Sequence, residues 1–505
     1  MAGPPTSLGM PSQNSLSGGM ARRAFAKQLA RFGAGCAAYR AVGRLARAAD
    51  LAPGSNVMDV LSTFMSKAAG TPLPAAVIEK AKFSVLDTFA SMLSGSKLPP
   101  GRFAIQLASA YGGPSVSMVA GSNILCGPIE AALSNGMLAH ADETDDTHPP
   151  SQSHPACSVV PSALAMGEKY HISGEHFLRA IALGYDIGTR VTITLGGLQY
   201  RAQSHRGTHS IAGTFGSAAT AGCVAKLNTR QMRWLLSYTA QEASGVAAWQ
   251  RDPDHIEKAF DFGGMPARNG VTAALMVAAG GTGVNDVFSG ADNFFEAFGP
   301  SSNPAGLIDR LGDRYEILRT EYKKWTVGSP IEAVLDALEN LIKNRGLQAD
   351  QVKQVRVRLA TNEASVVSNR EIASICLQHM VALMLVDRTV TFDSIHNESR
   401  MKDPAVLRQR AKVDLVGDEE LERLMPRRVA VVTVVLNDGK EWTERVDAVR
   451  GTAANPMSKD DIVSKARDLA EPVIGAARCR RLIERVFALD QIKDVVELRP
   501  LLQVR

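Results

Sequence analysis

The sequence of 505 residues lacks any apolar run approaching the roughly 20 residues that a membrane-spanning helix needs. It also lacks a strong excess of one charge, because the formal net charge is +5 and no basic block stands outside the N-terminus. The six cysteines are far apart and form no C-x-x-C pair, which argues against a zinc knuckle or a redox motif. These absences predict a protein with neither nucleic acid nor membrane as a partner, and with free thiols in a reducing compartment.

The first 54 residues differ from the rest of the chain. Residues 1–20 are rich in Gly, Ser and Pro, and the following stretch to Asp50 carries many Lys and Arg but no acid. Arg22 and Arg23 resemble a twin-arginine export signal, although Arg31 and Arg40 interrupt the apolar region that such a signal needs. An organelle transit peptide and a basic leader on a cytoplasmic protein are the other interpretations. We expect a cytoplasmic protein and leave the two targeted alternatives open.

Hydrophobic periodicity predicts a mainly α protein with an α+β part. A chain of this length is too long for one core, so two domains are expected. Residues 55–320 show helix after helix, whereas 352–360 alternate as a half-buried strand and 427–446 form two β runs around an Asp-Gly turn. The expected divisions are a leader at 1–54, a helical domain at 55–324, a smaller α+β lid at 325–450, and C-terminal helices at 451–505 that pack back on the helical domain.

The densest group of titratable residues lies at 140–154, HADETDDTHPPSQSH, between two apolar helical segments. Paired carboxylates raise one another's pKa and histidine titrates near neutrality, so this loop can hold both a proton donor and a proton acceptor. It matches neither H-E-x-x-H nor an EF-hand loop, and we therefore expect no metal. A solvated polar cap is the alternative.

Four further patches carry candidate residues. The segment 204–222 places Arg206 and His209 before a helix whose start favours anions. Two cations flank a Gly-Gly loop in KAFDFGGMPARNG (258–270), and the junction KKWTVGSP (323–330) holds cations at a hinge. His379 lies in the apolar segment ICLQHMVALMLV, where a core histidine is the commoner interpretation.

These patches, in this order, resemble the MmgE/PrpD family. The matching pieces are LPAAVIEKAKFSVLDTFASMLSG, HADETDDTHPPSQSHP, GTFGSAATA, KAFDFGGMPARNG, LQHMVALMLVDRTVTF and GTAANPM, and together they span 60–505. The resemblance implies a large helical domain with an inserted α+β lid, a homodimer, and activity without a metal or an organic cofactor. Position 143 is Glu where the family's decarboxylases have Asp, and His379 stands where they have tyrosine.

The resemblance also implies roles for particular side chains. The expected catalytic residues are Glu143, Asp146, Thr147, His154, His209 and His379, and the expected substrate-binding residues are Arg206, Lys258, Arg268, Lys324 and Ser329. The expected activity is that of a lyase, of the hydro-lyase or decarboxylase type, that removes a proton next to a carboxylate of a small di- or tricarboxylate. The alternatives are an epimerase or isomerase that uses the same site, a binding protein without activity, and a metal-dependent hydrolase.

Overall fold

The structure is a computed structural model that describes residues 56–504. The expectations for the leader at 1–54 fall on residues that lie outside this range. Within the described range, no helix has both the length and the apolarity needed to cross a membrane. The cysteines at 126, 157, 223, 376 and 479 are buried free thiols, as the sequence predicts.

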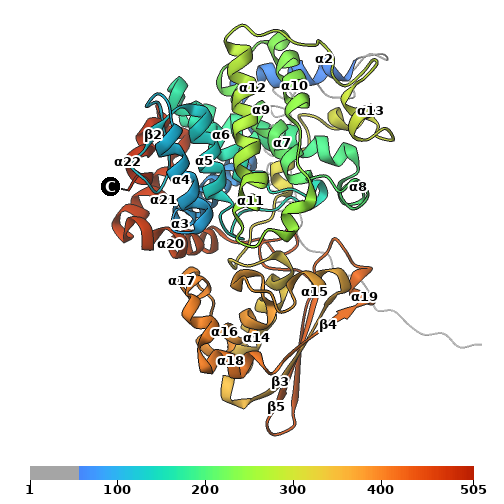
Figure 1. Cartoon of the computed structure of the whole chain (residues 1–505), viewed down its shortest axis with the longest axis vertical. Helices are drawn as coiled ribbons and strands as arrows, with labels where there is room; N and C mark the ends of the chain where they lie inside the picture. The colour runs from blue at the N-terminus through green and yellow to red at the C-terminus, as the bar shows by residue number, and fades with distance from the viewer. Residues whose placement is uncertain (1–55, 505) are drawn as a thin grey trace, which may run out of the picture. The chain divides into compact units, whose positions relative to one another are not determined.

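The first part of the described chain is helical, and Figure 1 shows its helices packed side by side. Its longer helices are α2 (Val57–Lys67), α3 (Ala75–Gly95), α4 (Pro99–Tyr111), α5 (Pro128–Ala139), α6 (Ala156–Tyr170), α7 (Gly174–Leu195), α8 (Gly197–Ser204), α9 (Thr208–Val224), α10 (Thr229–Glu242) and α12 (Met265–Ala278). Small residues let these helices approach closely. A Cβ at Gly188, for example, would collide with the carbonyl oxygen of Ala212 where α7 meets α9.

Shorter elements complete this helical part. They are the hairpin of β1 (Ser117–Met118) and β2 (Leu125–Cys126), helix α11 (Ile256–Ala259), the π-helical turn η5 (Phe260–Gly264) and α13 (Phe294–Phe298). The C-terminal helices are α20 (Lys459–Ile474), α21 (Ala476–Phe487) and α22 (Arg499–Leu502). Helices α20 and α21 contact α3, so the end of the chain returns to the helical part (Figure 1).

In the sequence, an α+β segment stands between the first helical part and the C-terminal helices. It contains α14 (Ser329–Arg345), β3 (Val352–Ala360), α15 (Thr361–Val367), α16 (Leu377–Asp387), α17 (Phe392–His396), α18 (Pro404–Arg410), β4 (Val413–Asp418), α19 (Glu419–Glu422), β5 (Ala430–Leu436) and β6 (Glu441–Val446). The strands form one sheet in the order β4-β3-β5-β6, in which β3 and β4 are parallel and the other pairs are antiparallel. The predicted strand and hairpin are confirmed, whereas β4 was not predicted.

Two hydrophobic cores correspond to these two parts. The first core takes its residues from Met58 to Tyr322 and again from Met457 to Leu502, with Phe392 of α17 added from the α+β segment. The second core lies entirely between Trp325 and Val449. The predicted fold class, a helical domain with a smaller α+β domain, is therefore confirmed.

Candidate active site

A cavity of roughly 370 Å³ is lined by residues attached to both cores. The helical part contributes the loop from Thr147 to His154, together with Arg201 and His209. The α+β segment contributes Ser329 and Glu332 of α14, residues 425–428 before β5, and residues 447–450 after β6. Polar side chains from separate segments converge on this space, which is typical of a site for a small polar molecule.

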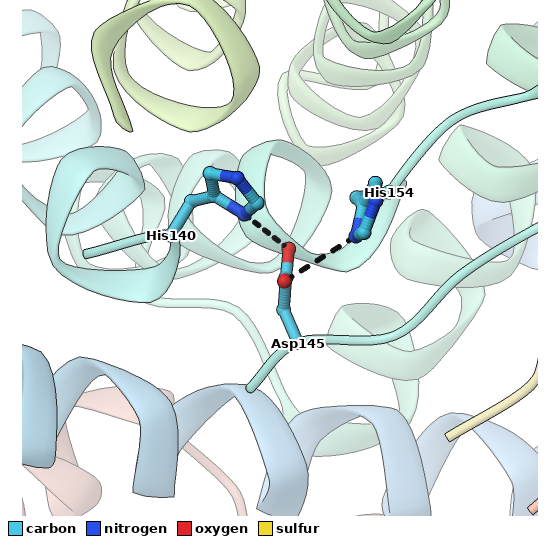
Figure 2. Close-up of side chains that lie close together, drawn as sticks. All are labelled: His140, Asp145 and His154. Carbon is cyan, nitrogen blue, oxygen red and sulfur yellow. Dashed lines mark hydrogen bonds and ion pairs between the residues drawn. The ribbon is translucent and has the colours of Figure 1, made fainter. Parts of the chain in front are cut away.

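Asp145 joins two histidines beside the cavity (Figure 2). The carboxylate is fully buried and lies 2.9 Å from Nδ1 of His140 and 3.3 Å from Nδ1 of His154. Burial opposes ionisation, but the two histidines hold the pKa of Asp145 well below its usual range. An ionised carboxylate only accepts hydrogen bonds, so His140 Nδ1 is the donor in its hydrogen bond to Asp145, and His154 Nδ1 lies at ion-pair distance from the same carboxylate.

His154 is the histidine of this pair that lines the cavity. Burial lowers its pKa to about 4, so the imidazole is neutral at pH 7. The ring of His209 lies 5.1 Å from the ring of His154, centroid to centroid, and stacks on Phe262 at 3.8 Å. His209 stands in the first turn of α9, which begins at Thr208 and not near position 211 as predicted. The cavity wall thus carries two neutral imidazoles side by side.

The Glu143 carboxylate forms ion pairs with two lysines. It accepts from Lys258 and, at 2.9 Å, from Lys323, and Lys323 lines the cavity. Burial opposes ionisation of Glu143, but Lys258 and Lys323 hold its pKa well below its usual range. Lys258 Nζ also lies 5.3 Å from the centre of the Phe262 ring. The pairing fixes Lys323 as a cation in the cavity wall.

Asp146 and Thr147 have structural contacts in the same loop. Asp146 accepts from the Tyr185 hydroxyl at 2.6 Å and from the backbone N–H of Ala156 at 3.1 Å. Burial raises the pKa of Asp146 to about 8. Thr147 lines the cavity and forms a two-way backbone bridge with Glu321. These bonds fix the loop that carries His154.

Glu332 is a cavity residue that the sequence did not single out. It is 3% exposed, and its Oε1 has no hydrogen-bond partner among the described residues. Burial raises its pKa to about 8, although the nearby Lys323 opposes the shift. A carboxyl group that stays protonated at neutral pH is a proton donor.

Three buried side chains have donors in reach of a metal ion. They are His140, Asp145 and His154, whose nearest ligand atoms lie within 4.8 Å of one another. Imidazole and carboxylate are ligands that zinc and other divalent transition metals accept. His140 Nδ1 is hydrogen-bonded to Asp145 Oδ2, whereas His154 Nδ1 and Asp145 Oδ1 have no hydrogen-bond partner among the described residues.

Seven of the eleven expected site residues do not line this cavity: Glu143, Asp146 and Lys258, whose contacts are given above, and four others. Arg206 lies over the ring of Phe298, and Arg268 donates to Asn269. Lys324 pairs with Glu339, so the hinge cation that faces the cavity is its neighbour Lys323. The fourth, His379, is fully buried in the second core, and neither of its ring nitrogens has a partner among residues 56–504.

The Gly-Gly loop has a packing role that the sequence did not predict. A Cβ at Gly263 would collide with the carbonyl oxygen of Gly136, so η5 crosses α5 at backbone contact. This close approach places Phe262 between His140 and His209, at 4.4 and 3.8 Å from their ring centres. The loop therefore shapes the histidine cluster, and no anion needs to be bound there.

Comparison with known proteins gives matches along most of the chain. Residues 59–306 match the MmgE/PrpD N-terminal domain, and residues 325–490 match the MmgE/PrpD C-terminal domain. The chain is 27% identical to a cis-aconitate decarboxylase-like protein of Aspergillus oryzae, over 90% of this chain and 98% of that protein. It is 25% identical to the cis-aconitate decarboxylase of Aspergillus terreus over the same shares, and 27% identical to that of Homo sapiens over 85% and 90%.

Proposed function

The chain belongs to the MmgE/PrpD family, and on that premise we propose that it is a lyase that removes a proton next to a carboxylate of a small di- or tricarboxylate. One observation carries the proposal. His154 turns Nδ1 toward the buried Asp145, 3.3 Å away, and lies in the wall of a cavity that also holds the Lys323 cation. A neutral imidazole beside a cation that can hold a carboxylate supports this proposal.

The proposed reaction begins when a substrate carboxylate binds against Lys323. The cation withdraws electron density and makes the neighbouring C–H more acidic. Nε2 of His154 takes that proton, and Asp145 stabilises the imidazolium that forms. The electron pair left on carbon then expels a hydroxyl group, which leaves as water with the proton of Glu332, and a carbon–carbon double bond forms.

The relatives are named as cis-aconitate decarboxylases, and loss of CO₂ is the other lyase reaction that such a site can perform. In that case a C–C bond breaks, CO₂ leaves, and the electron pair on carbon takes the proton of Glu332. Both reactions use the same cation and the same acid/base groups. We therefore propose the class of lyase and let the experiment identify the bond that breaks.

Epimerisation is the second candidate. The His209 ring lies 5.1 Å from that of His154, and both imidazoles are neutral. A second imidazole next to the first can return a proton to the carbon from which the first has removed one. This reaction has no leaving group, so exchange of the C–H proton with solvent would occur without loss of water or CO₂.

The experiment follows proton NMR spectra of di- and tricarboxylates incubated with the full chain in heavy water. A lyase gives an alkene signal or loss of a carboxyl group, whereas an epimerase gives deuterium incorporation without either. His154→Asn should abolish both signals while the melting temperature stays the same. His171→Asn is the matched control, because His171 has a side chain that is 68% exposed and pairs with Asp494 at the surface.

We also propose that the protein is a homodimer that works without a metal or an organic cofactor. Elemental analysis, activity after treatment with a chelator, and the mass in solution test these points together. If a chelator abolishes activity and a divalent cation restores it, the His140, Asp145 and His154 cluster becomes a metal site and the mechanism above is wrong. If no carboxylate reacts or exchanges with a folded protein, the binding-protein alternative replaces the lyase.

A further inference from the structure

The cations that line the cavity are not all balanced by carboxylates. Five Lys or Arg side chains line it: Arg201, Lys323, Arg427, Arg428 and Arg450. Lys323 shares the single Glu143 carboxylate with Lys258, and Arg450 pairs with Asp461. Arg428 pairs with Glu363, whereas Arg201 and Arg427 form no ion pair with a carboxylate among residues 56–504.

Arg201 is the clearest of these unbalanced charges. It stands on α8, in the helical part, and no carboxylate among residues 56–504 forms an ion pair with it. Its side chain donates a hydrogen bond to Gln152 Oε1 at 3.4 Å, and its guanidinium lies 5.7 Å from the centre of the Trp249 ring. Burial and the charge of Arg428 both lower the pKa of Arg201. Arg201 is half-buried and a guanidinium stays charged, so this position favours a bound anion.

Arg428 reaches the cavity from the α+β segment. Its Nε donates to Glu363 at 2.9 Å, while its Nη1 and Nη2 atoms donate to no residue within 56–504. The guanidinium fork presents these two nitrogens in the geometry that suits a carboxylate. Three acids also line the cavity. Asp447 pairs with Arg445, Glu332 is the proton donor described above, and Glu321 forms no ion pair within the described range, although the charge of Arg428 opposes the rise that burial causes in the pKa of Glu321.

We propose that Arg201 and Arg428 form a second anion subsite, for a carboxylate of the substrate remote from the reacting carbon. The proposal rests on the function proposed above and assigns two residues to the second carboxylate of the di- or tricarboxylate proposed there. One arginine belongs to each core, so a carboxylate bound between them also joins the helical and α+β domains. A substrate with a single carboxylate lacks this link and binds poorly.

Tricarballylate and butyrate are the probes, because both are unreactive and they differ in the number of carboxylates. Calorimetry on the full chain should show that tricarballylate binds much more tightly than butyrate. A hydrogen bond to a charged group is worth about 1.5–3 kcal/mol, so Arg201→Gln should weaken tricarballylate about 10- to 100-fold. The affinity for butyrate should stay within about twofold.

Arg428→Lys is the second variant, because Arg428→Gln would leave the buried Glu363 without its partner. The lysine keeps the charge and loses the fork, so we expect an intermediate loss of tricarballylate affinity. Arg356→Gln is the control: Arg356 is an exposed arginine on β3, and the substitution makes the same change of charge. It should bind both probes as the unaltered protein does.

The outcomes separate this proposal from the proposed function. If Arg201→Gln and Arg428→Lys bind both probes normally, or if the unaltered protein does not prefer tricarballylate at millimolar concentrations, the subsite is wrong. Turnover in heavy water can still be observed in that case. If the preference depends on both arginines but no polycarboxylate reacts or exchanges, the subsite stands and the lyase proposal fails.

Discussion

Lys465 of α20 bonds to the loop 140–154, and we expect its substitution to lower stability and activity together. Its Nζ lies 2.6 Å from Asp87 of α3 and donates to the carbonyl oxygen of Thr144 at 2.6 Å. Lys465 is 7% exposed and Asp87 is 2% exposed. Lys465→Met would leave the Asp87 carboxylate buried without a cation, which typically costs about 3–5 kcal/mol.

The expected shift in melting temperature follows from the size of the protein. An unfolding entropy of about 2.1 cal/mol/K per residue over about 450 residues gives roughly 0.9 kcal/mol/K, so the melting temperature should fall by about 3–5 °C. The turnover number should fall as well, because the Thr144 carbonyl loses its donor one residue before Asp145. Calorimetry and steady-state kinetics on the same preparation measure both effects.

A double variant tests whether the loss of stability comes from the unpaired Asp87 charge. Asp87→Asn removes the charge that Lys465 neutralises, so the free-energy loss in the combined variant should be at least about 1 kcal/mol smaller than the sum of the single losses. Lys493→Met, an exposed lysine near the C-terminus, is the control for loss of a positive charge. The reasoning is refuted if Lys465→Met melts and turns over like the control, or if the two losses simply add.

Three further predictions concern the proposed chemistry. If Glu332 gives a proton and His154 takes one, kcat/KM should rise with pH through about 4 and fall through about 8, the pKa values of His154 and Glu332. Glu332→Gln should lower kcat about 10²- to 10⁴-fold and remove the alkaline fall, and an unchanged pH–rate profile would contradict the assignment. Asp145→Asn should lower kcat by a similar factor of about 10²–10⁴ while circular dichroism shows an intact fold. His379→Leu should leave kcat unchanged and the melting temperature equal or higher, because it removes two buried nitrogens that lack partners; a large fall in kcat would restore the catalytic role expected from the sequence.

The fold could be predicted wherever the local pattern carried the signal. The alternation of VKQVRVRLA predicted β3, and Asp438-Gly439 predicted the turn between β5 and β6, where Gly439 has φ +83°. Strand β4 was missed because VDLVGD has a weak alternation, with only its first and last residues buried. Its parallel partner β3 lies some 60 positions earlier in the chain, and such pairing leaves no local trace.

The site could be predicted only in part, for a similar reason. The density of acids and histidines at 140–154 identified the loop, because those residues are neighbours in sequence. Arg201, Glu332 and Arg428 were missed, because each is an isolated polar residue that only the tertiary fold brings to the cavity. Lys324 was preferred over Lys323 because sequence does not show which of two adjacent side chains faces inward.

Residues attached to both cores line the cavity, and this division predicts which kinetic constant, kcat or KM, a substitution changes. His154, Asp145 and Glu143 belong to one tightly bonded loop of the helical part, whereas residues 425–428 come from the α+β segment. The two parts also meet at α17, where His396 Nε2 lies 3.1 Å from Asp142 Oδ2. Substitutions in the loop should therefore change kcat, since they alter groups fixed before substrate binds. Substitutions at residues 425–428 should change KM first, since in the proposed subsite they alter contacts that form only when the substrate bridges both domains.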